Sequence, residues 1–211
     1  MKSIVKPIEL EIKILEINEK DVIDKLIDLG AKKLMDTITY IKVFDISSII
    51  NLKKIPIKYH KIINEVIAIT SNGKSLRDQN FHLRVRQQGN HFELTVKYAN
   101  GINTKVKSEI EINVEISQLE FENIETILSV GGLKLIAQQQ KKRISYKLNT
   151  LHFDIDKWPG IPTYLEIEGE AETDILKVIK TLDLDYDKIS LLSGAKLFSE
   201  YGINFYSNLS F

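Results

Sequence analysis

IELEIK, residues 8–13, places a charged side chain at every second position, with Glu9, Glu11 and Lys13 separated by aliphatic residues. Successive side chains of a β-strand point to opposite faces, so a strand here carries charges on one face and aliphatic side chains on the other. The alternation alone does not say which face is buried. The charged face is either a solvated surface or part of a site, and the rest of the chain decides between the two.

The same two-residue alternation recurs along most of the chain and predicts about eight strands. Two turn-like stretches, QQGN (87–90) and LNTL (148–151), each join a pair of these strands, so we expect neighbouring strands to pair antiparallel. The expected strands lie near residues 8–15, 38–45, 81–88, 91–98, 106–116, 136–148, 151–157 and 162–169.

Four intervals have the spacing of amphipathic helices. The first begins after Asn18, a capping residue, and ends at Gly30, which suits the position after a helix. The second opens with the capping-box pair Ser117 and Glu120. The other two helices are expected at roughly 172–182 and 188–201.

Composition limits the possible functions. The 211 residues contain 29 Lys plus Arg and 29 Asp plus Glu, and this balance argues against a partner such as a nucleic acid duplex. The absence of cysteine excludes disulfides, thiolate nucleophiles and zinc–thiolate sites. No apolar stretch is long enough for a membrane span, so we expect a cytoplasmic protein. No Pro- or Gly-rich linker divides the chain, which predicts one domain over residues 1–211.

The charges on the predicted strands are sorted by sign from strand to strand. Strands 81–88 and 136–148 carry cations, whereas strands 151–157 and 162–169 carry carboxylates. Carboxylates two residues apart on a strand are separated by roughly 7 Å, and at an effective dielectric constant near 20 they repel by about 2 kcal/mol. Several such pairs need compensation from facing Arg and Lys or from hard divalent cations such as Mg²⁺ or Mn²⁺.

Two arrangements follow from this pattern. In one, an open antiparallel sheet exposes its charged face to water. In the other, the sheet closes into a barrel with helices outside, and the charged face lines a channel. The sorting of charges favours the channel, because solubilising charges would mix signs along each strand. A cationic wall opposite a metal-binding carboxylate wall suits a polyphosphate, so the residues predict a metal-dependent triphosphate site.

Six motifs in order along the chain resemble those of the CYTH, or triphosphate tunnel metalloenzyme, superfamily. Glu9 to Lys13 has the ExExK form that opens this superfamily. ExExK alone is short and common in strands, but six matches with the same inward parity are specific. The other five are LRVR (83–86), LTVK (94–97), KSEIEINVEI (107–116), KKR (141–143) and FDIDKWPGIPTYLEIEGE (153–170).

The resemblance implies an α+β fold, with an eight-stranded antiparallel closed β-barrel whose tunnel binds a triphosphate and helices packed on the outside. It implies catalytic roles for Lys13 and Glu11. The connection between Asp45 and Leu83 is longer than in many members of the superfamily, which predicts an insertion at about 46–80. Asp156 is the preferred aspartate ligand, with Asp154 as the alternate, and Trp158 and Tyr164 either pack the loop, which we favour, or stack on a base. The implied metal ligands are Glu9, Glu11, Asp156, Glu166 and Glu168. The implied substrate contacts are Lys13, Arg84, Arg86, Lys97, Lys107, Lys141 and Arg143.

The expected activity is divalent-metal-dependent hydrolysis of a triphosphate, with Mg²⁺ or Mn²⁺ as cofactor. The substrate class includes tripolyphosphate, thiamine triphosphate and ATP. Two alternatives stay open: a class IV adenylyl cyclase that converts ATP to cyclic AMP and pyrophosphate, and a non-enzymatic polyphosphate- or nucleotide-binding module. A homodimer is also left open.

Overall fold

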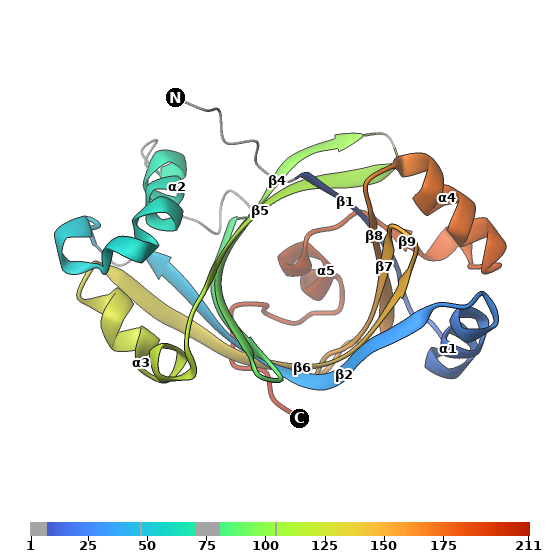
Figure 1. Ribbon diagram of the computed structural model, residues 1–211, viewed down its shortest axis with the longest axis horizontal. Coiled ribbons are helices and arrows are strands. Elements are labelled where there is room, and N and C mark those ends of the chain that lie inside the picture. The colour runs from blue at the N-terminus through green and yellow to red at the C-terminus, as the bar shows by residue number, and fades with distance from the viewer. Residues whose placement is uncertain (1–7, 47, 71–80, 104) are drawn as a thin grey trace.

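Eight strands close into an antiparallel barrel (Figure 1). The computed structural model describes residues 8–46, 48–70, 81–103 and 105–211. Around the ring the strand order is β5-β4-β3-β2-β6-β7-β8-β1, and β1 pairs with β5 to complete it. The strands are β1 Ile8–Ile14, β2 Lys32–Ile46, β3 Phe81–Gln88, β4 His91–Asn103, β5 Val106–Glu115, β6 Leu133–Leu148, β7 Leu151–Lys157 and β8 Tyr164–Gly169.

The strand that contains IELEIK closes the barrel. β1 pairs with β8 over Leu10–Ile14 and with β5 over Ile8–Glu11, antiparallel in both cases. In this register Glu9 lies opposite Glu109 on β5, and Glu11 lies opposite Glu168 on β8. The predicted closed barrel, with its charged face inside, is therefore confirmed.

Both predicted hairpins are present. Gln88 pairs with His91, and Leu148 pairs with Leu151, so each turn has two residues. β2 is longer than the predicted strand 38–45, since it begins at Lys32. The added residues pair with the C-terminal half of β6. Their side chains are largely exposed, so this stretch of the sequence lacks the alternation of apolar and polar residues by which the strands were predicted.

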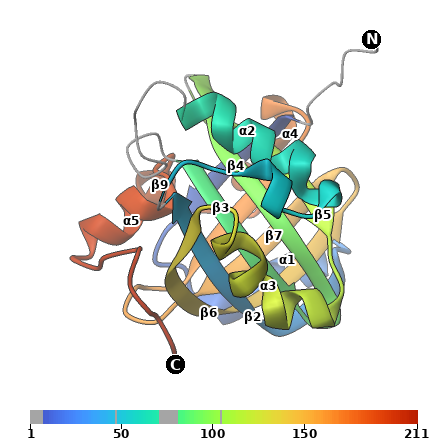
Figure 2. The same ribbon diagram turned by 90° about the vertical axis from the view of Figure 1, so that its left-hand side faces the viewer.

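Helices cover the barrel on two sides and at one end (Figures 1 and 2). The Asn18 cap and the Ser117–Glu120 capping box are both formed, as predicted. α1 and α4 lie on one side of the barrel, α2 and α3 lie on the other, and α5 lies at one end. The helices are α1 Glu19–Asp28, α2 His60–Thr70, α3 Gln118–Ser129, α4 Glu172–Thr181 and α5 Gly194–Glu200. None of those in the described part of the chain has the length and apolar composition that a membrane span requires.

The helix expected at 188–201 is replaced by three shorter elements. The 3₁₀ turn η4, Tyr186–Lys188, is followed by the two-residue strand β9, Ile189–Ser190, and only then by α5. β9 pairs with Lys13 and Ile14 of β1, and the backbone N–H of Leu15 donates to the carbonyl of Lys188. These tertiary hydrogen bonds hold the segment extended, so the helix begins only at Gly194.

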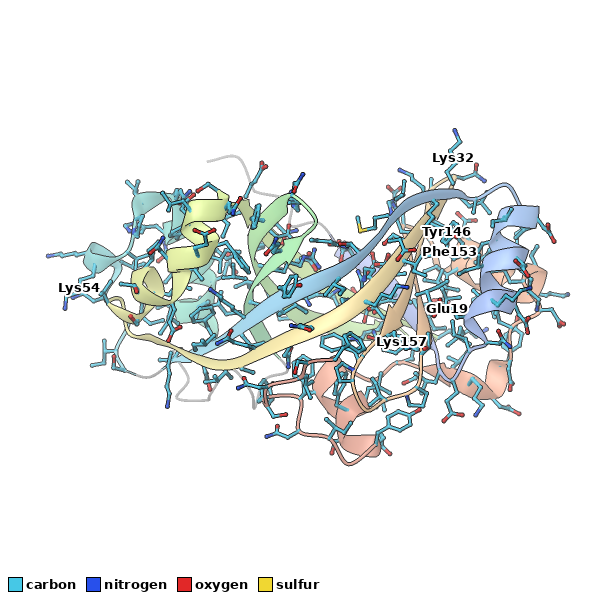
Figure 3. The ribbon with its side chains drawn as sticks, turned by 90° about the horizontal axis from the view of Figure 1, so that it is seen from below. Glu19, Lys32, Lys54, Tyr146, Phe153 and Lys157 are labelled. Carbon is cyan, nitrogen blue, oxygen red and sulfur yellow. The ribbon has the colours of Figure 1, made fainter. Side chains whose placement is uncertain are left out.

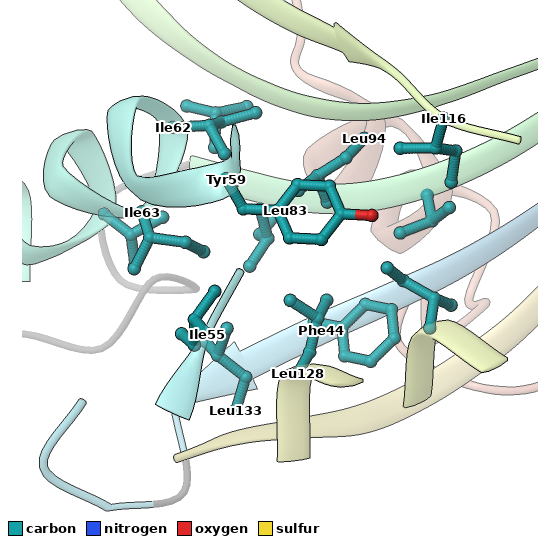
Figure 4. Packing of buried hydrophobic residues seen from close by; sticks show 14 of the residues in the cluster. Phe44, Ile55, Tyr59, Ile62, Ile63, Leu83, Leu94, Ile116, Leu128 and Leu133 are labelled. Atoms are coloured by element: carbon teal, nitrogen blue, oxygen red, sulfur yellow. The ribbon is translucent and has the colours of Figure 1, made fainter. Parts of the chain in front are cut away.

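The aliphatic face of the strands packs outward against the helices. One cluster lies between α2, α3 and strands β3 to β5, and includes Tyr59, Leu83 and Leu94 (Figure 4). A second lies between α1, α4 and strands β1 and β6 to β8, and includes Tyr146 and Phe153 (Figure 3). Burial of each such side chain contributes about 1.5–3 kcal/mol. These two hydrophobic cores therefore lie outside the barrel, and most of its interior is left for polar side chains.

The expected insertion at about 46–80 contributes the 3₁₀ turns η1, Leu52–Lys54, and η2, Ile57–Tyr59, together with α2; positions 47 and 71–80 lie outside the described residues. A glycine pair after α3 fixes this segment to the barrel. The Gly131 carbonyl accepts from the N–H of Asn51, and the Gly132 carbonyl accepts from the N–H of Ser48. Gly132 has φ +98°, and a Cβ there would lie 2.8 Å from the carbonyl oxygen of Ile49.

We expect Gly132→Ala to destabilise the protein by about 2–5 kcal/mol, because it combines left-handed backbone strain with a clash against backbone. Gly30→Ala is the matched control: its φ is +81°, but a Cβ there meets nothing within 4 Å. The control should cost only about 1–2 kcal/mol. Urea unfolding measures both variants, and equal losses would contradict the close approach of Ile49 to Gly132.

Candidate functional site

The barrel encloses a cavity of about 360 Å³. This volume is at the lower end of the roughly 300–1,000 Å³ typical of small-molecule sites. Inward side chains from all eight barrel strands line it, and every residue assigned to the site from the sequence is among them. These residues are Glu9, Glu11, Lys13, Arg84, Arg86, Lys97, Lys107, Lys141, Arg143, Asp156, Glu166 and Glu168.

The charges that line the cavity are nearly balanced. Seven basic side chains face eight acidic ones, so with all of them ionised the lining carries one net negative charge. The basic members are the seven substrate contacts implied by the resemblance, and the acidic members add Glu109, Glu111 and Asp154 to the five implied metal ligands. A polyanion therefore finds many donors here but no excess of positive charge.

Glu11 is the centre of one ion-pair network. Its carboxylate lies 2.7 Å from Nζ of Lys13, 3.2 Å from Nζ of Lys97 and 3.0 Å from Nζ of Lys107. Burial alone would raise the pKa of Glu11, but these ammonium groups lower it well below its usual value. Lys97 also lies 2.8 Å from Glu109. Removing the charge of Glu11 would leave each of these three lysines with one carboxylate partner fewer.

Glu11, Glu166 and Glu168 form a compact acidic group. One carboxylate oxygen from each lies within 4.8 Å of the others, because β1 and β8 are neighbours and Glu11 lies directly opposite Glu168. Within the described residues Glu168 forms no ion pair, and it is the one acidic side chain of the lining for which this holds. Burial, reinforced by repulsion from Glu166, raises the pKa of Glu168 well above its usual value. Clustered carboxylate oxygens of this kind can hold a hard metal ion.

The other two carboxylates assigned to metal binding lie elsewhere in the cavity. Glu9 is nearer the solvent and lies 3.5 Å from Lys97. Asp156 is fully buried and accepts from Nε and Nη2 of Arg143 at 2.6 and 2.5 Å and from Nζ of Lys141 at 2.7 Å. Burial would raise the pKa of Asp156, but these cations lower it well below its usual value. Asp154, the alternate, is also paired with Arg143.

The two arginines of β3 face the same carboxylate. Glu111 lies 3.6 Å from Nη2 of Arg84 and 3.4 Å from Nη2 of Arg86. Burial would raise the pKa of Glu111, but Lys97 and the two arginines lower it to about 2. Nε of Arg84 is buried and has no hydrogen-bond partner among the described residues. This guanidinium therefore has a free donor inside the barrel.

Some lining residues were not assigned from the sequence. Gln139 has the same parity on β6 as Lys141 and Arg143, and this parity was a signal that could have identified it. The C-terminal segment contributes Ser193, Gly194, Phe198 and Phe205. No strand alternation marks these positions as inward, and they reach the cavity only through the tertiary fold. Finding them requires the structure.

Trp158 and Tyr164 pack within the loop and against the C-terminal segment. Nε1 of Trp158 donates to the Tyr164 hydroxyl at 3.1 Å, and its ring meets that of Phe198 edge-on at a centroid distance of 5.1 Å. Both side chains are buried. These contacts support the packing interpretation of the two aromatic residues.

Solved structures with the same fold come from several organisms. A candidate adenylate cyclase from Vibrio parahaemolyticus is 14% identical, with a TM-score of 0.65 over 92% of this chain and 99% of that one. The PH1012 protein from Pyrococcus horikoshii OT3 is 20% identical, with a TM-score of 0.62 over 87% and 95% of the two chains. HpAC1 from Hippeastrum, an adenylyl cyclase candidate with a stated dominant triphosphatase activity, is 16% identical, with a TM-score of 0.57 over 92% and 94%.

At these identities the likeness shows the fold alone. No curated protein matches the sequence significantly. The model of the CYTH domain matches residues 69–194, which is more than half of the chain. That stretch contains β3 to β8 and most of the charged lining. With its closed barrel and its charged interior, the chain belongs to the CYTH family.

Proposed function

We propose that this protein is a divalent-metal-dependent enzyme that hydrolyses a triphosphate inside the barrel. One observation carries the proposal: a compact group of three carboxylates shares a single cavity with seven basic side chains. Arg and Lys are the usual ligands of phosphoryl oxygens, and carboxylates are the usual ligands of Mg²⁺ and Mn²⁺. A site for a phosphate chain alone would need mainly the cations.

The charge balance supports a requirement for metal. A triphosphate adds several negative charges to a lining that is already close to neutral. In a buried site of low effective dielectric constant, this excess would be strongly unfavourable without counter-charge. Divalent cations that enter with the substrate supply it. Glu11, Glu166 and Glu168 would hold such a cation, and Glu9 and Asp156 stay predictions as further ligands.

The side chains that line the cavity have distinct roles in this proposal. Mg²⁺ or Mn²⁺, when bound, would neutralise phosphoryl charge and polarise the reacting phosphorus and water. Lys13, now 2.7 Å from Glu11 and 3.5 Å from Glu166, is placed to exchange a carboxylate partner for a phosphoryl oxygen. Arg84 contributes its Nε donor, which has no hydrogen-bond partner among the described residues. Asp156 holds Arg143 and Lys141 in place, so their donors are oriented before substrate binds.

A product assay tests the reaction. Purified protein is incubated with Mg²⁺ or Mn²⁺ and with tripolyphosphate, thiamine triphosphate or ATP, and orthophosphate, pyrophosphate and cyclic AMP are resolved. We expect metal-dependent release of orthophosphate from at least one substrate, and none after chelation. Cyclic AMP with pyrophosphate would show a cyclase instead, and binding without turnover of any substrate would show a binding module.

We expect Glu168→Gln to lower metal-dependent turnover by about 100-fold or more, equivalent to about 2.7 kcal/mol of transition-state stabilisation. Substitution of Glu168 tests metal binding more selectively than substitution of Glu11. Glu11 forms ion pairs with three lysines, so its loss would also affect stability. Glu170→Gln is the matched control, since Glu170 is exposed and lies outside the cavity lining. Full activity of Glu168→Gln would show that Glu168 is not an essential metal ligand.

The stability of the same variant gives a second readout. The raised pKa of Glu168 means that its ionisation opposes folding, so without metal Glu168→Gln should be at least as stable as the wild type at neutral pH. Below the unfolded pKa of about 4.5 the carboxyl is protonated in both states, and the difference should vanish. Added Mg²⁺ or Mn²⁺ should raise the melting temperature of the wild type and of Glu170→Gln, and raise that of Glu168→Gln much less. An equal metal-induced rise in all three proteins would contradict the assignment.

A further inference from the structure

The C-terminal segment lies across one end of the barrel. α5 lies within the outline of the ring in Figure 1, and Figure 2 shows it at one end of the barrel. After α5 the chain returns to an edge of β6, where Leu209 exchanges backbone hydrogen bonds with Gln138 and Gln140 at 3.0 and 2.8 Å. The CYTH family match ends at residue 194, so nearly all of this segment lies beyond it.

Aromatic side chains cluster at this end. Phe198 of α5 is buried, and its ring centroid lies 5.1 Å from that of Trp158 and 5.2 Å from that of Phe205. Phe205 also packs against the start of α5, since a Cβ on Gly194 would lie 3.4 Å from its ring. Nε2 of Gln139 on β6 donates to the carbonyl of Phe205, which fixes the segment to the barrel wall.

On two of the strands, β1 and β7, the exposure of the inward side chains falls toward this end. On β1 the side chain of Glu9 is 37% exposed, that of Lys13 is 6% exposed, and Leu15 already packs in the cluster that contains Phe198. On β7 exposure falls in the same direction, from 13% at the Asp154 side chain to 0% at Asp156. Four residues of a strand tilted by about 40° span about 10 Å along the barrel axis. The buried donors of Lys13 and Lys141 lie at the deep end.

We propose that α5 and the segment after it make the tunnel a blind pocket, which admits a phosphate chain only by a free terminal phosphate. This inference rests on the proposed function and specifies its substrate class: triphosphates with at least one unsubstituted end. The terminal phosphate lies deepest, near Lys13, Lys141 and Arg143, and any organic group stays toward the mouth. A chain substituted at both ends does not fit, because the aromatic wall leaves no exit for the second substituent.

Three ligands of equal chain length test the proposal on the wild-type protein. Tripolyphosphate has two free ends, ATP has one and diadenosine triphosphate has none. Calorimetric titration with Mg²⁺ present gives their dissociation constants. We expect the first two to bind and diadenosine triphosphate to bind about 100-fold more weakly than ATP, as two lost hydrogen bonds to charged groups would cause. Equal affinity of ATP and diadenosine triphosphate would overturn the proposal, and so would a protein that binds none of the three.

Phe205→Ala tests the role of the closed end, because it removes a lining ring and leaves the backbone carbonyl that Gln139 contacts. Phe211→Ala is the matched control, since Phe211 belongs to the same segment, is 60% exposed and does not line the cavity. We expect Phe205→Ala to reduce the preference for ATP over diadenosine triphosphate about tenfold, equivalent to about 1.4 kcal/mol. An unchanged preference in a folded Phe205→Ala protein would overturn the role of the C-terminal segment.

Phosphate release is measured in the same samples and reports on the proposed function alone. If ATP and tripolyphosphate bind as expected and no substrate is turned over, hydrolysis is rejected and the blind pocket stands. If tripolyphosphate is hydrolysed and diadenosine triphosphate binds as tightly as ATP, hydrolysis stands and the blind pocket is rejected. The two proposals can therefore fail separately.

Discussion

Closure of the sheet by β1 is the constraint on which the rest of the structure depends. β1 is a short strand, yet it pairs with β8 and β5 on its two edges. A barrel closed in this way has no free edge, and strand alternation then directs every second side chain of all eight strands inward. Without this pairing the charged face of an open sheet would be exposed to water, and the carboxylates and cations of distant strands would not be brought together. IELEIK therefore determines both the fold and the position of the site.

A charged interior is stable only if its charges compensate one another. In the described part of the chain, seven of the eight acidic side chains of the lining pair with a basic one, and Glu168 is the exception. Breaking a buried ion pair by removing one partner typically costs about 3–5 kcal/mol. Most lining residues therefore contribute to folding as well as to the site. The ionised form of Glu168 destabilises the folded protein when no metal is bound, and a bound cation would offset this destabilisation.

The sequence was most informative where structure is local. Alternation located the strands and the inward face, and the Asn18 cap and the Ser117–Glu120 box marked helix starts, because each of these signals lies within a few residues. Features that depend on distant partners were not predictable in this way. The segment at 189–190 has a helix-like pattern but is held extended by β1. The C-terminal segment joins the cavity lining through residues such as Phe198 and Phe205, which lie far from the strands in the sequence. The pairing of Asp156 with Arg143 and Lys141 likewise depends on the tertiary register of β6 and β7.

Placing the hydrophobic cores outside the barrel separates stability from the site. The clusters under α2 and α3 and under α1 and α4 bury the aliphatic face of the strands, so the interior does not need apolar side chains to hold the sheet together. The interior can then keep donors and acceptors paired with one another until a ligand arrives. In the proposed reaction, ligand binding would exchange these pairs instead of creating charges in a dry cavity. Its net free energy would depend on how well phosphoryl oxygens replace the carboxylates around the basic side chains, and on how well a metal ion replaces the basic side chains around the carboxylates. The third cluster, around Phe198, differs because it lies across the end of the barrel, and there apolar packing itself shapes the site.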